Sequence, residues 1–203
     1  MLCTRTIRPL LVAAGNGDAH LSAASGLVRI GRRLYVVADD ENMLSIFDLD
    51  DDRPGTLRGL FEGDLPATNE ARKAAKADLE SLTVLPPFPG NPTGALLALG
   101  SGSRPQRQRA ALISLDRAGA LDGIVREIDL SALYAPLRQL HPLLNIEGAF
   151  VNSGHLCLLQ RGHAGDPVNA LIRFDWDRVQ RWLQDFGRMP GPQGQRQGAS
   201  EQP

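Results

Sequence analysis

The sequence predicts an all-β fold: a partial β-propeller of about three blades, each a four-stranded antiparallel sheet, with short helical insertions. Two observations predict it. Three segments open alike, with small and acidic residues before an apolar strand, and further short strands follow each opening. The openings make Gly26, Ser81 and Gly148 equivalent, and these starts lie about 55 and about 67 residues apart, close to the length of one blade.

Short apolar runs separated by turn residues define the strands. The first and second segments each hold four runs, which predicts two antiparallel meanders, and the third segment holds three. The predicted strands cover residues 26–30, 34–39, 44–48 and 56–61, then 82–85, 95–99, 110–115 and 124–128, then 149–152, 156–160 and 171–174. The three blades therefore span about residues 24–62, 78–129 and 145–176.

Other segments depart from the strand pattern. Residues 175–184 carry Trp176, Val179 and Trp182 at helical spacing, which favours a short amphipathic helix where a fourth strand is expected. Residues 67–77 predict a helical insertion with Thr68 as its N-cap, and residues 4–12 predict an edge strand. The propeller domain then covers residues 1–187, and the Gly-, Pro- and Gln-rich residues 188–203 predict a disordered tail.

Three blades do not close a ring, because closed propellers typically have four to eight. An open arc leaves sheet edges and an apolar face uncovered, and something must cover them. Two expectations follow. Either the chain is the N-terminal half of a longer protein and lacks its C-terminal blades, or two copies associate as a homodimer.

Composition limits the possible partners. The 22 Lys and Arg residues nearly balance the 23 Asp and Glu residues, and the net charge of -1 gives no broad field to attract nucleic acid or an anionic membrane. No secretory signal and no long apolar span stand out, so we expect a cytoplasmic protein with neither a nucleic-acid nor a membrane partner. Cys3 and Cys157 belong to no metal-binding or disulfide pattern, and Cys157 is typical of a small core residue.

Acidic residues mark the starts of the predicted blades. First strands line the central channel of a propeller, so Glu80 and Glu147 should converge near the axis, with Asp78 and Asn145 beside them. Neighbouring carboxylates repel unless a cation or a shared proton lies between them, and oxygen ligands suit Ca²⁺. The sequence therefore predicts a Ca²⁺ site at these four residues. The alternative is that both carboxylates accept backbone N–H groups at the strand starts.

Polar loops at the same end of the blades suggest an anion site. Small residues in the loop at 100–105 let an anion approach the backbone, and an arginine can grip phosphate or carboxylate with two hydrogen bonds. The candidate residues are Ser101, Ser103, Arg104, Arg161 and His163. The alternative is a solvated hairpin loop. Lys73 and Lys76 are expected on an exposed charged helix face.

Several stretches resemble an uncharacterised bacterial β-propeller family of the DUF6929 type, related to the domain called esterase-like activity of phytase. They include SGLVRIGRRLYVVADDE, DLESLTVLP, ALLALGSGSRP and LNIEGAFV. The resemblance implies a propeller with acidic blade starts, in a group with calcium-dependent or phosphoester-cleaving members, and this chain looks like the N-terminal half.

The function expected from these observations is metal-assisted hydrolysis of a phosphoester or ester. A bound metal polarises the ester and activates water, while the basic loops hold a small anionic ligand. The alternatives are a non-catalytic propeller that binds a ligand or a protein partner, and an inactive truncated fragment. No linear catalytic signature, such as GxSxG or HExxH, decides between them.

Overall fold

Antiparallel sheets dominate the computed structural model, which describes residues 8–14 and 17–185. The first sheet pairs β3 (Ala24–Ile30), β4 (Arg33–Ala38), β5 (Met43–Asp48) and β6 (Thr56–Gly59) in chain order. The second pairs β7 (Leu79–Leu85), β8 (Ala95–Gly100), β9 (Arg109–Leu115) and β10 (Leu121–Asp129). The third holds β11 (Ile146–Asn152), β12 (His155–Gln160) and β13 (Ala170–Asp175). Every strand predicted in the three repeated segments has a counterpart in these sheets, and among the described residues the third sheet has three strands, as predicted.

Tight turns explain why neighbouring segments pair. Two residues, Ser153 and Gly154, join β11 to β12, and both have positive φ, at 47° and 75°. This is the backbone of a type I′ turn, whose twist matches that of the strands it connects. In all three sheets the strands pair in chain order, as expected for a meander.

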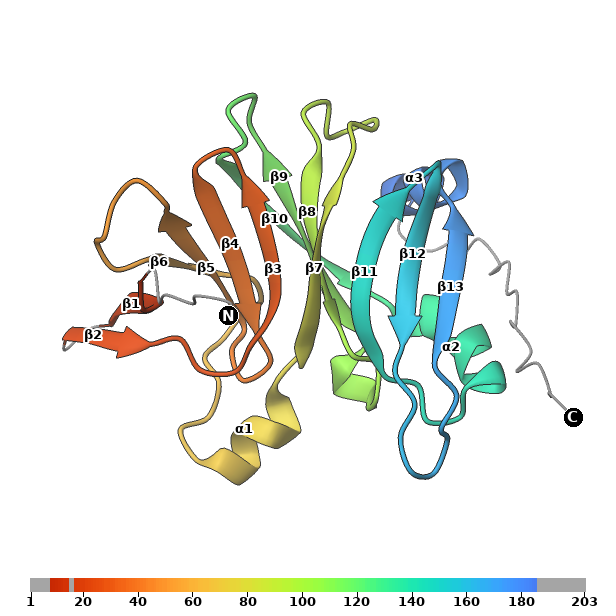
Figure 1. Ribbon diagram of the computed structural model, residues 1–203. Helices are drawn as coiled ribbons and strands as arrows, with labels where there is room; N and C mark the ends of the chain where they lie inside the picture. Colours follow the sequence, from red (N-terminus) through yellow and green to blue (C-terminus); the bar gives the residue numbers. More distant parts are fainter. Residues whose placement is uncertain (1–7, 15–16, 186–203) are drawn as a thin grey trace, which may run out of the picture.

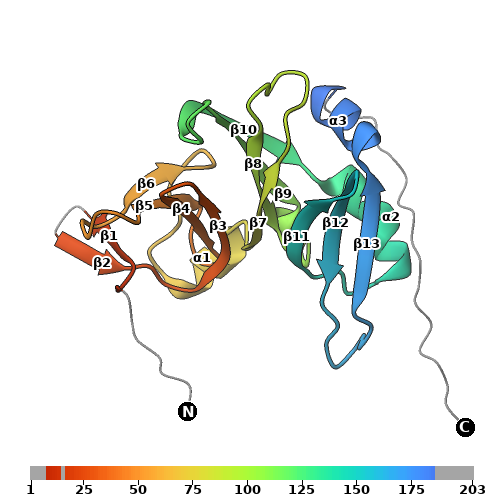
Figure 2. The same cartoon turned by 45° about the horizontal axis from the view of Figure 1, so that its top comes forward.

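The three sheets stack in a row, with their first strands side by side. Strand β7 contacts both β3 and β11, and the fan of sheets is visible in Figures 1 and 2. One apolar cluster lies between the first and second sheets and includes Tyr35, Val37, Leu82 and Leu96. A second cluster fills the space between the second and third sheets, and it includes β8, β9, β12 and β13 residues. Stability thus depends on contacts between sheets.

Two helices complete the second cluster. Helix α3 (Trp176–Asp185) follows β13 directly and buries Val179, Trp182 and Leu183, so the predicted amphipathic helix is confirmed. Helix α2 (Ser131–Leu140) buries Leu133, Tyr134 and Leu137 in the same cluster. Helix α2 was not among the elements predicted from the sequence. Its interior Pro136 is typical of a helix break, and burial of the apolar face outweighs this local preference.

Helix α1 (Asn69–Ala75) lies between the first and second sheets in the sequence, inside the predicted range of 67–77. Thr68 stands at the N-cap position, as predicted, although its side chain makes no capping hydrogen bond. No side chain of α1 itself is buried. The helix matters mainly because Lys76, at its C-cap, leads the chain into the site described below.

The N-terminal segment differs from the prediction. The strand expected at residues 4–12 is instead β1 (Leu11–Ala14), and it forms a hairpin with β2 (Gly17–His20). Backbone hydrogen bonds join Ala13 N to Gly55 O (3.0 Å) and Gly55 N to Leu11 O (2.7 Å). Val12 packs on Val36 and Phe47 of the first sheet. The hairpin is held there by side-chain packing that a local pattern does not reveal. Residues 1–7 lie outside the described residues, as does the predicted disordered tail.

Among the described residues, none of the helices combines the length and apolarity needed to cross a bilayer.

Candidate functional site

Each sheet carries a β-bulge at the same place in its first strand. The register shifts between Ala24 and Gly26 in β3, between Leu79 and Ser81 in β7, and between Ile146 and Gly148 in β11. The extra residues are therefore Ser25, Glu80 and Glu147. This repeated bulge confirms that Gly26, Ser81 and Gly148 are equivalent. Bulges often redirect a side chain near a functional site.

Glu80 lies among other acidic groups. Burial first, and then the negative charges of Glu147, Asp78 and Asp39 in that order, raise the pKa of its carboxyl, and a hydrogen bond from Ser25 acts in the opposite direction; together they give a pKa of about 7. The three bulge residues thus come together from three different sheets. The predicted convergence of Glu80 and Glu147 agrees with this proximity.

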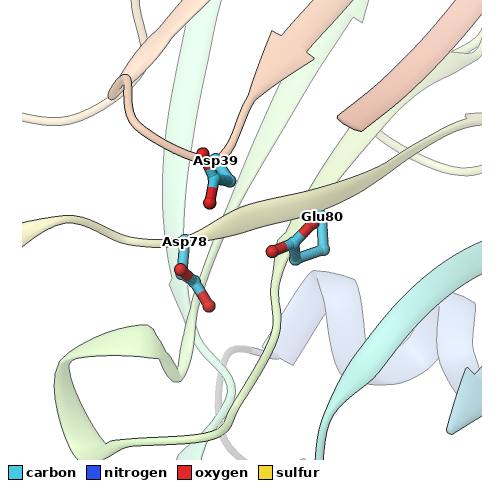
Figure 3. A group of neighbouring side chains, drawn as sticks. All are labelled: Asp39, Asp78 and Glu80. Carbon is cyan, nitrogen blue, oxygen red and sulfur yellow. The ribbon is translucent and has the colours of Figure 1, made fainter. Parts of the chain in front are cut away.

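Asp39, Asp78 and Glu80 form a compact acidic group (Figure 3). One carboxylate oxygen from each lies within 4.8 Å of the others. Asp39 follows the end of β4, and Asp78 precedes β7 with a positive φ of 58°, which only a few non-glycine residues adopt. The Asp78 carboxylate contacts two basic side chains, Lys76 and Arg107.

Lys76 lies within this acidic group. Its ammonium is 2.9 Å from Asp39 Oδ2, 2.9 Å from Asp40 Oδ1 and 3.2 Å from Asp78 Oδ1, and only 5% of its side chain is exposed. Burial opposes its charge, but the hydrogen bonds to these carboxylates outweigh burial and raise the pKa of Lys76. In return, the hydrogen bond from Lys76 lowers the pKa of Asp40. The expectation of an exposed Lys76 is wrong, because the chain turns inward after α1. Lys73, within α1, is exposed as expected.

The second carboxylate oxygen of Asp78 also has polar partners. The Ser101 hydroxyl donates to Asp78 Oδ2 at 2.6 Å, and Arg107 Nη1 lies 2.9 Å from the same oxygen. Both oxygens of this buried carboxylate therefore have partners. Asp39 differs, because its Oδ1 is buried without a hydrogen-bond partner among the described residues.

Glu147 has its own partners in the third sheet. Asn145 Nδ2 donates to Glu147 Oε1 at 2.7 Å, and Arg161 Nη2 lies 2.8 Å from the same oxygen. These donors are side chains, whereas the alternative drawn from the sequence expected backbone N–H groups. Asn145 and Glu147 therefore come together as predicted, and Arg161 joins them as a counter-charge.

The loop at residues 100–105 uses its own backbone amides. Ser101 N donates to Asp78 O, Gly102 N to Arg107 O, and Ser103 N to Ser101 Oγ, at 2.9, 3.0 and 3.2 Å. Arg104 is exposed and precedes the short 3-10 helix η1 (Pro105–Arg107). These amides are thus engaged internally, and an anion at this loop depends on the Arg104 side chain.

His163 lies on a different loop. It is an exposed residue of the β12–β13 connection, and Gly165 N donates to its Nδ1 at 3.3 Å.

Four charged residues of the site were missing from the predicted set: Asp39, Asp40, Lys76 and Arg107. One signal points to Asp39. The bulge registers pair Ala24 with Ala38, Leu79 with Gly100 and Ile146 with Gln160, so the residues that follow are equivalent. These are Asp39, Ser101 and Arg161, and each borders the cluster. Aligning the three segments would have found them, whereas nothing local marks Lys76 as buried.

The charges of the cluster do not cancel. Its carboxylates are Asp39, Asp40, Asp78, Glu80 and Glu147, and its cations are Lys76, Arg107 and Arg161. With Glu80 ionised, two negative charges remain in a partly buried region. Two cavities of about 280 and 330 Å³ lie at the first sheet, and Glu80 lines neither. The candidate site is therefore a charged cluster where the sheets meet.

Fold and site together define a protein of stacked antiparallel sheets, with an acidic cluster where the first strands meet. The chain belongs to DUF6929, a family of unknown function, whose model matches residues 20–197. The match includes all three stacked sheets. A comparison with curated proteins finds no match.

Proposed function

We propose that the three sheets are blades of a β-propeller and that the chain binds a cation, with Ca²⁺ as the preferred ion, where the first strands meet. The side-by-side arrangement of β3, β7 and β11 supports the propeller. In this proposal Asp39 and Glu80 supply the principal ligands. Glu147 and Asp78 add negative potential from either side.

One observation carries the choice of ligand: within residues 8–14 and 17–185, the buried Asp39 Oδ1 has no hydrogen-bond partner, and it belongs to a group whose oxygens lie within 4.8 Å of one another. Oxygens on opposite sides of a Ca²⁺ ion lie up to about 5 Å apart, because each Ca–O bond is about 2.3–2.6 Å long. A cation between Asp39 and Glu80 satisfies this oxygen. It also relieves the repulsion that raises the pKa of Glu80.

The charge balance supports a cation over an anion. The cluster keeps two negative charges when Glu80 is ionised, and an anion placed there meets repulsion in a region of reduced dielectric. Lys76 already neutralises part of the charge of Asp39 and Asp78. We therefore expect weak Ca²⁺ binding, with a Kd on the order of 10⁻⁴–10⁻³ M, as for sites with few charged ligands.

Calorimetric titration with Ca²⁺ tests this proposal. The wild-type chain should bind one ion, and Glu80→Gln should lose binding because it removes an anionic ligand while keeping the shape. Glu62→Gln is the matched control, since Glu62 is an exposed residue. Absence of binding in the wild type, or equal binding in Glu80→Gln, contradicts the proposal.

A second candidate function is hydrolysis of an ester or phosphoester, and the pKa of Glu80 in the chain without bound metal favours it. A carboxyl with a pKa of about 7 can exchange a proton at neutral pH, as a general acid or base requires. Arg104 and His163, both exposed, are the groups available to hold the anionic part of such a substrate. Release of 4-nitrophenol from its phosphate and acetate esters, compared between wild type and Glu80→Gln with and without Ca²⁺, tests it. Equal rates in all samples contradict hydrolysis and leave the binding proposal intact.

A further inference from the structure

The sheets of this chain use one kind of contact twice. Each sheet has a leading face, toward the next sheet in the chain, and a trailing face, toward the previous one. The leading face of the first sheet, with Val28 and Val37, packs on Leu82 and Leu96 of the second. The leading face of the second sheet, with Leu97 and Leu99, packs on the trailing face of the third, with Leu156, Leu158 and Ile172.

The third sheet exposes an apolar leading face. Strand pairing sets Phe150 opposite Cys157 and Leu159 opposite Leu171, on the side away from Leu156 and Leu158. Phe150, Leu159 and Leu171 are 38%, 45% and 45% exposed. In the other two sheets the same face is buried against the following sheet. The third sheet therefore offers the surface that normally receives a trailing face.

The first sheet exposes part of its trailing face. Leu27 is 58% exposed, whereas Leu82, its equivalent in the second sheet, is only 6% exposed because the first sheet covers it. Further from β3, the β1–β2 hairpin covers Val36 and Phe47 with Val12. Leu27 is thus uncovered on the strand where neighbouring sheets approach most closely.

We propose that a second copy of this chain docks on the third sheet through the trailing face of its own first sheet. The two faces already fit within one chain, because the leading-to-trailing contact occurs twice there. A two-fold axis makes the contact reciprocal, so that two copies form one closed ring of six sheets. Six lies within the four to eight blades of closed propellers, and closure prevents open-ended growth.

The ring also has room for the hairpin. Sheets in a propeller diverge away from the axis, and between the second and third sheets α2 and α3 fill the outer space. The β1–β2 hairpin occupies the corresponding place on the outer side of the first sheet. It therefore fills the wedge between the copies while Leu27 meets Phe150 and Leu159 of the other copy near the axis.

Closure completes the candidate site. Within one chain, Ser25 of the first sheet precedes Glu80 of the second, and Glu80 precedes Glu147 of the third. In the ring, Glu147 is followed by the partner's Ser25, and both sets of bulge residues surround one axis. The inference depends on the proposed propeller arrangement and not on cation binding.

Sedimentation equilibrium of the full chain tests the inference. The wild type should have twice the chain mass of 21.9 kDa. Leu27→Glu and Leu159→Lys alter exposed residues on the two complementary faces, so each variant should fold, checked by circular dichroism, and be a monomer. Ile124→Lys is the matched control, because Ile124 is 54% exposed on the outermost strand of the second sheet, and it should remain a dimer.

Mixing the two variants identifies which faces meet. An equimolar mixture of Leu27→Glu and Leu159→Lys should recover the dimer, because the mixed pair has one unaltered contact and one contact between opposite charges. A monomeric wild type, a dimer that persists in Leu27→Glu, failure of the mixture to associate, or open-ended assemblies would each overturn the proposal. Mass reports association whether or not Ca²⁺ binds, so this proposal and the cation proposal fail separately.

Discussion

At the scale of single residues, the cluster disfavours the negative charge of Glu80 and favours the positive charge of Lys76. Burial and neighbouring carboxylates disfavour the charge of Glu80, whereas three carboxylates stabilise the charge of the buried Lys76. Their positions differ by only four residues. The chain therefore brings a disfavoured carboxylate and a favoured ammonium into one cluster. The stability of the fold and the binding of a ligand depend on the same charges there.

Replacing Glu80 should change how stability depends on pH. Its pKa of about 7 in the folded chain exceeds the ordinary value of 4.5, so the folded state holds the proton more tightly and stability falls as pH rises between these values. Because Glu80 is partly exposed, we expect Glu80→Gln to be about 1–2 kcal/mol more stable than wild type at pH 8. The gain should vanish near pH 4. Urea unfolding in the presence of a chelator measures it, and an equal difference at both pH values would contradict this explanation.

Removing the Lys76 charge should destabilise the fold. Lys76→Met leaves Asp39, Asp40 and Asp78 without their shared ammonium, and breaking a buried ion pair typically costs about 3–5 kcal/mol. We expect a loss of about 3 kcal/mol in the free energy of unfolding. Lys73→Met on the exposed face of α1 is the control and should change it by less than about 0.5 kcal/mol. Similar losses in the two variants would show that the ion pairs contribute little.

At the scale of elements, the bulged first strands combine close packing with redirected side chains. A Cβ atom added to Gly26 would lie 2.6 Å from Leu82 N and 2.9 Å from Ser81 C, both of which are backbone atoms of β7. The glycine thus allows β3 and β7 to approach closely beside the bulge residues Ser25 and Glu80. The separation between these strands sets the geometry of the site.

Adding a methyl group at Gly26 should therefore separate the two sheets. We expect Gly26→Ala to reduce the free energy of unfolding by about 1–3 kcal/mol, because the neighbouring backbone has no room to move without disturbing the core. Gly59→Ala, on the edge strand β6, is the control. A Cβ atom added there would have Met43 Sδ as its nearest neighbour, at 3.9 Å, so we expect the free energy of unfolding to change by less than about 0.5 kcal/mol. Thermal unfolding of both variants tests this expectation. Equal melting temperatures would exclude a close-packing role for Gly26.

At the scale of the whole molecule, two apolar clusters join three sheets into a row. Each cluster combines residues of the second sheet with residues of one neighbouring sheet. The first and third sheets therefore both bury apolar side chains against the second. The ends of the row differ: the hairpin covers much of the first sheet, and the leading face of the third remains exposed. This asymmetry is what makes the proposed reciprocal dimer specific in its contacts.

Much of the local structure could be predicted from the sequence, since strands, turns and α3 depend on patterns within about ten residues. The equivalence of Gly26, Ser81 and Gly148 was predicted for the same reason. Helix α2 was not predicted, because the burial of Leu133, Tyr134 and Leu137 outweighs the unfavourable Pro136 only in the folded chain. The hairpin β1–β2 likewise depends on its packing against Val36 and Phe47.

The sequence by itself determined the order of the strands, the division into three repeated sheets and the convergence of acidic residues at their starts. Only the tertiary structure decided which charges meet. Lys76 reaches Asp39 across 37 positions, and Arg107 reaches Asp78 across 29, distances over which no local pattern acts. The packing of one sheet on the next sets these contacts, because it buries the charged groups together and obliges each to find a partner.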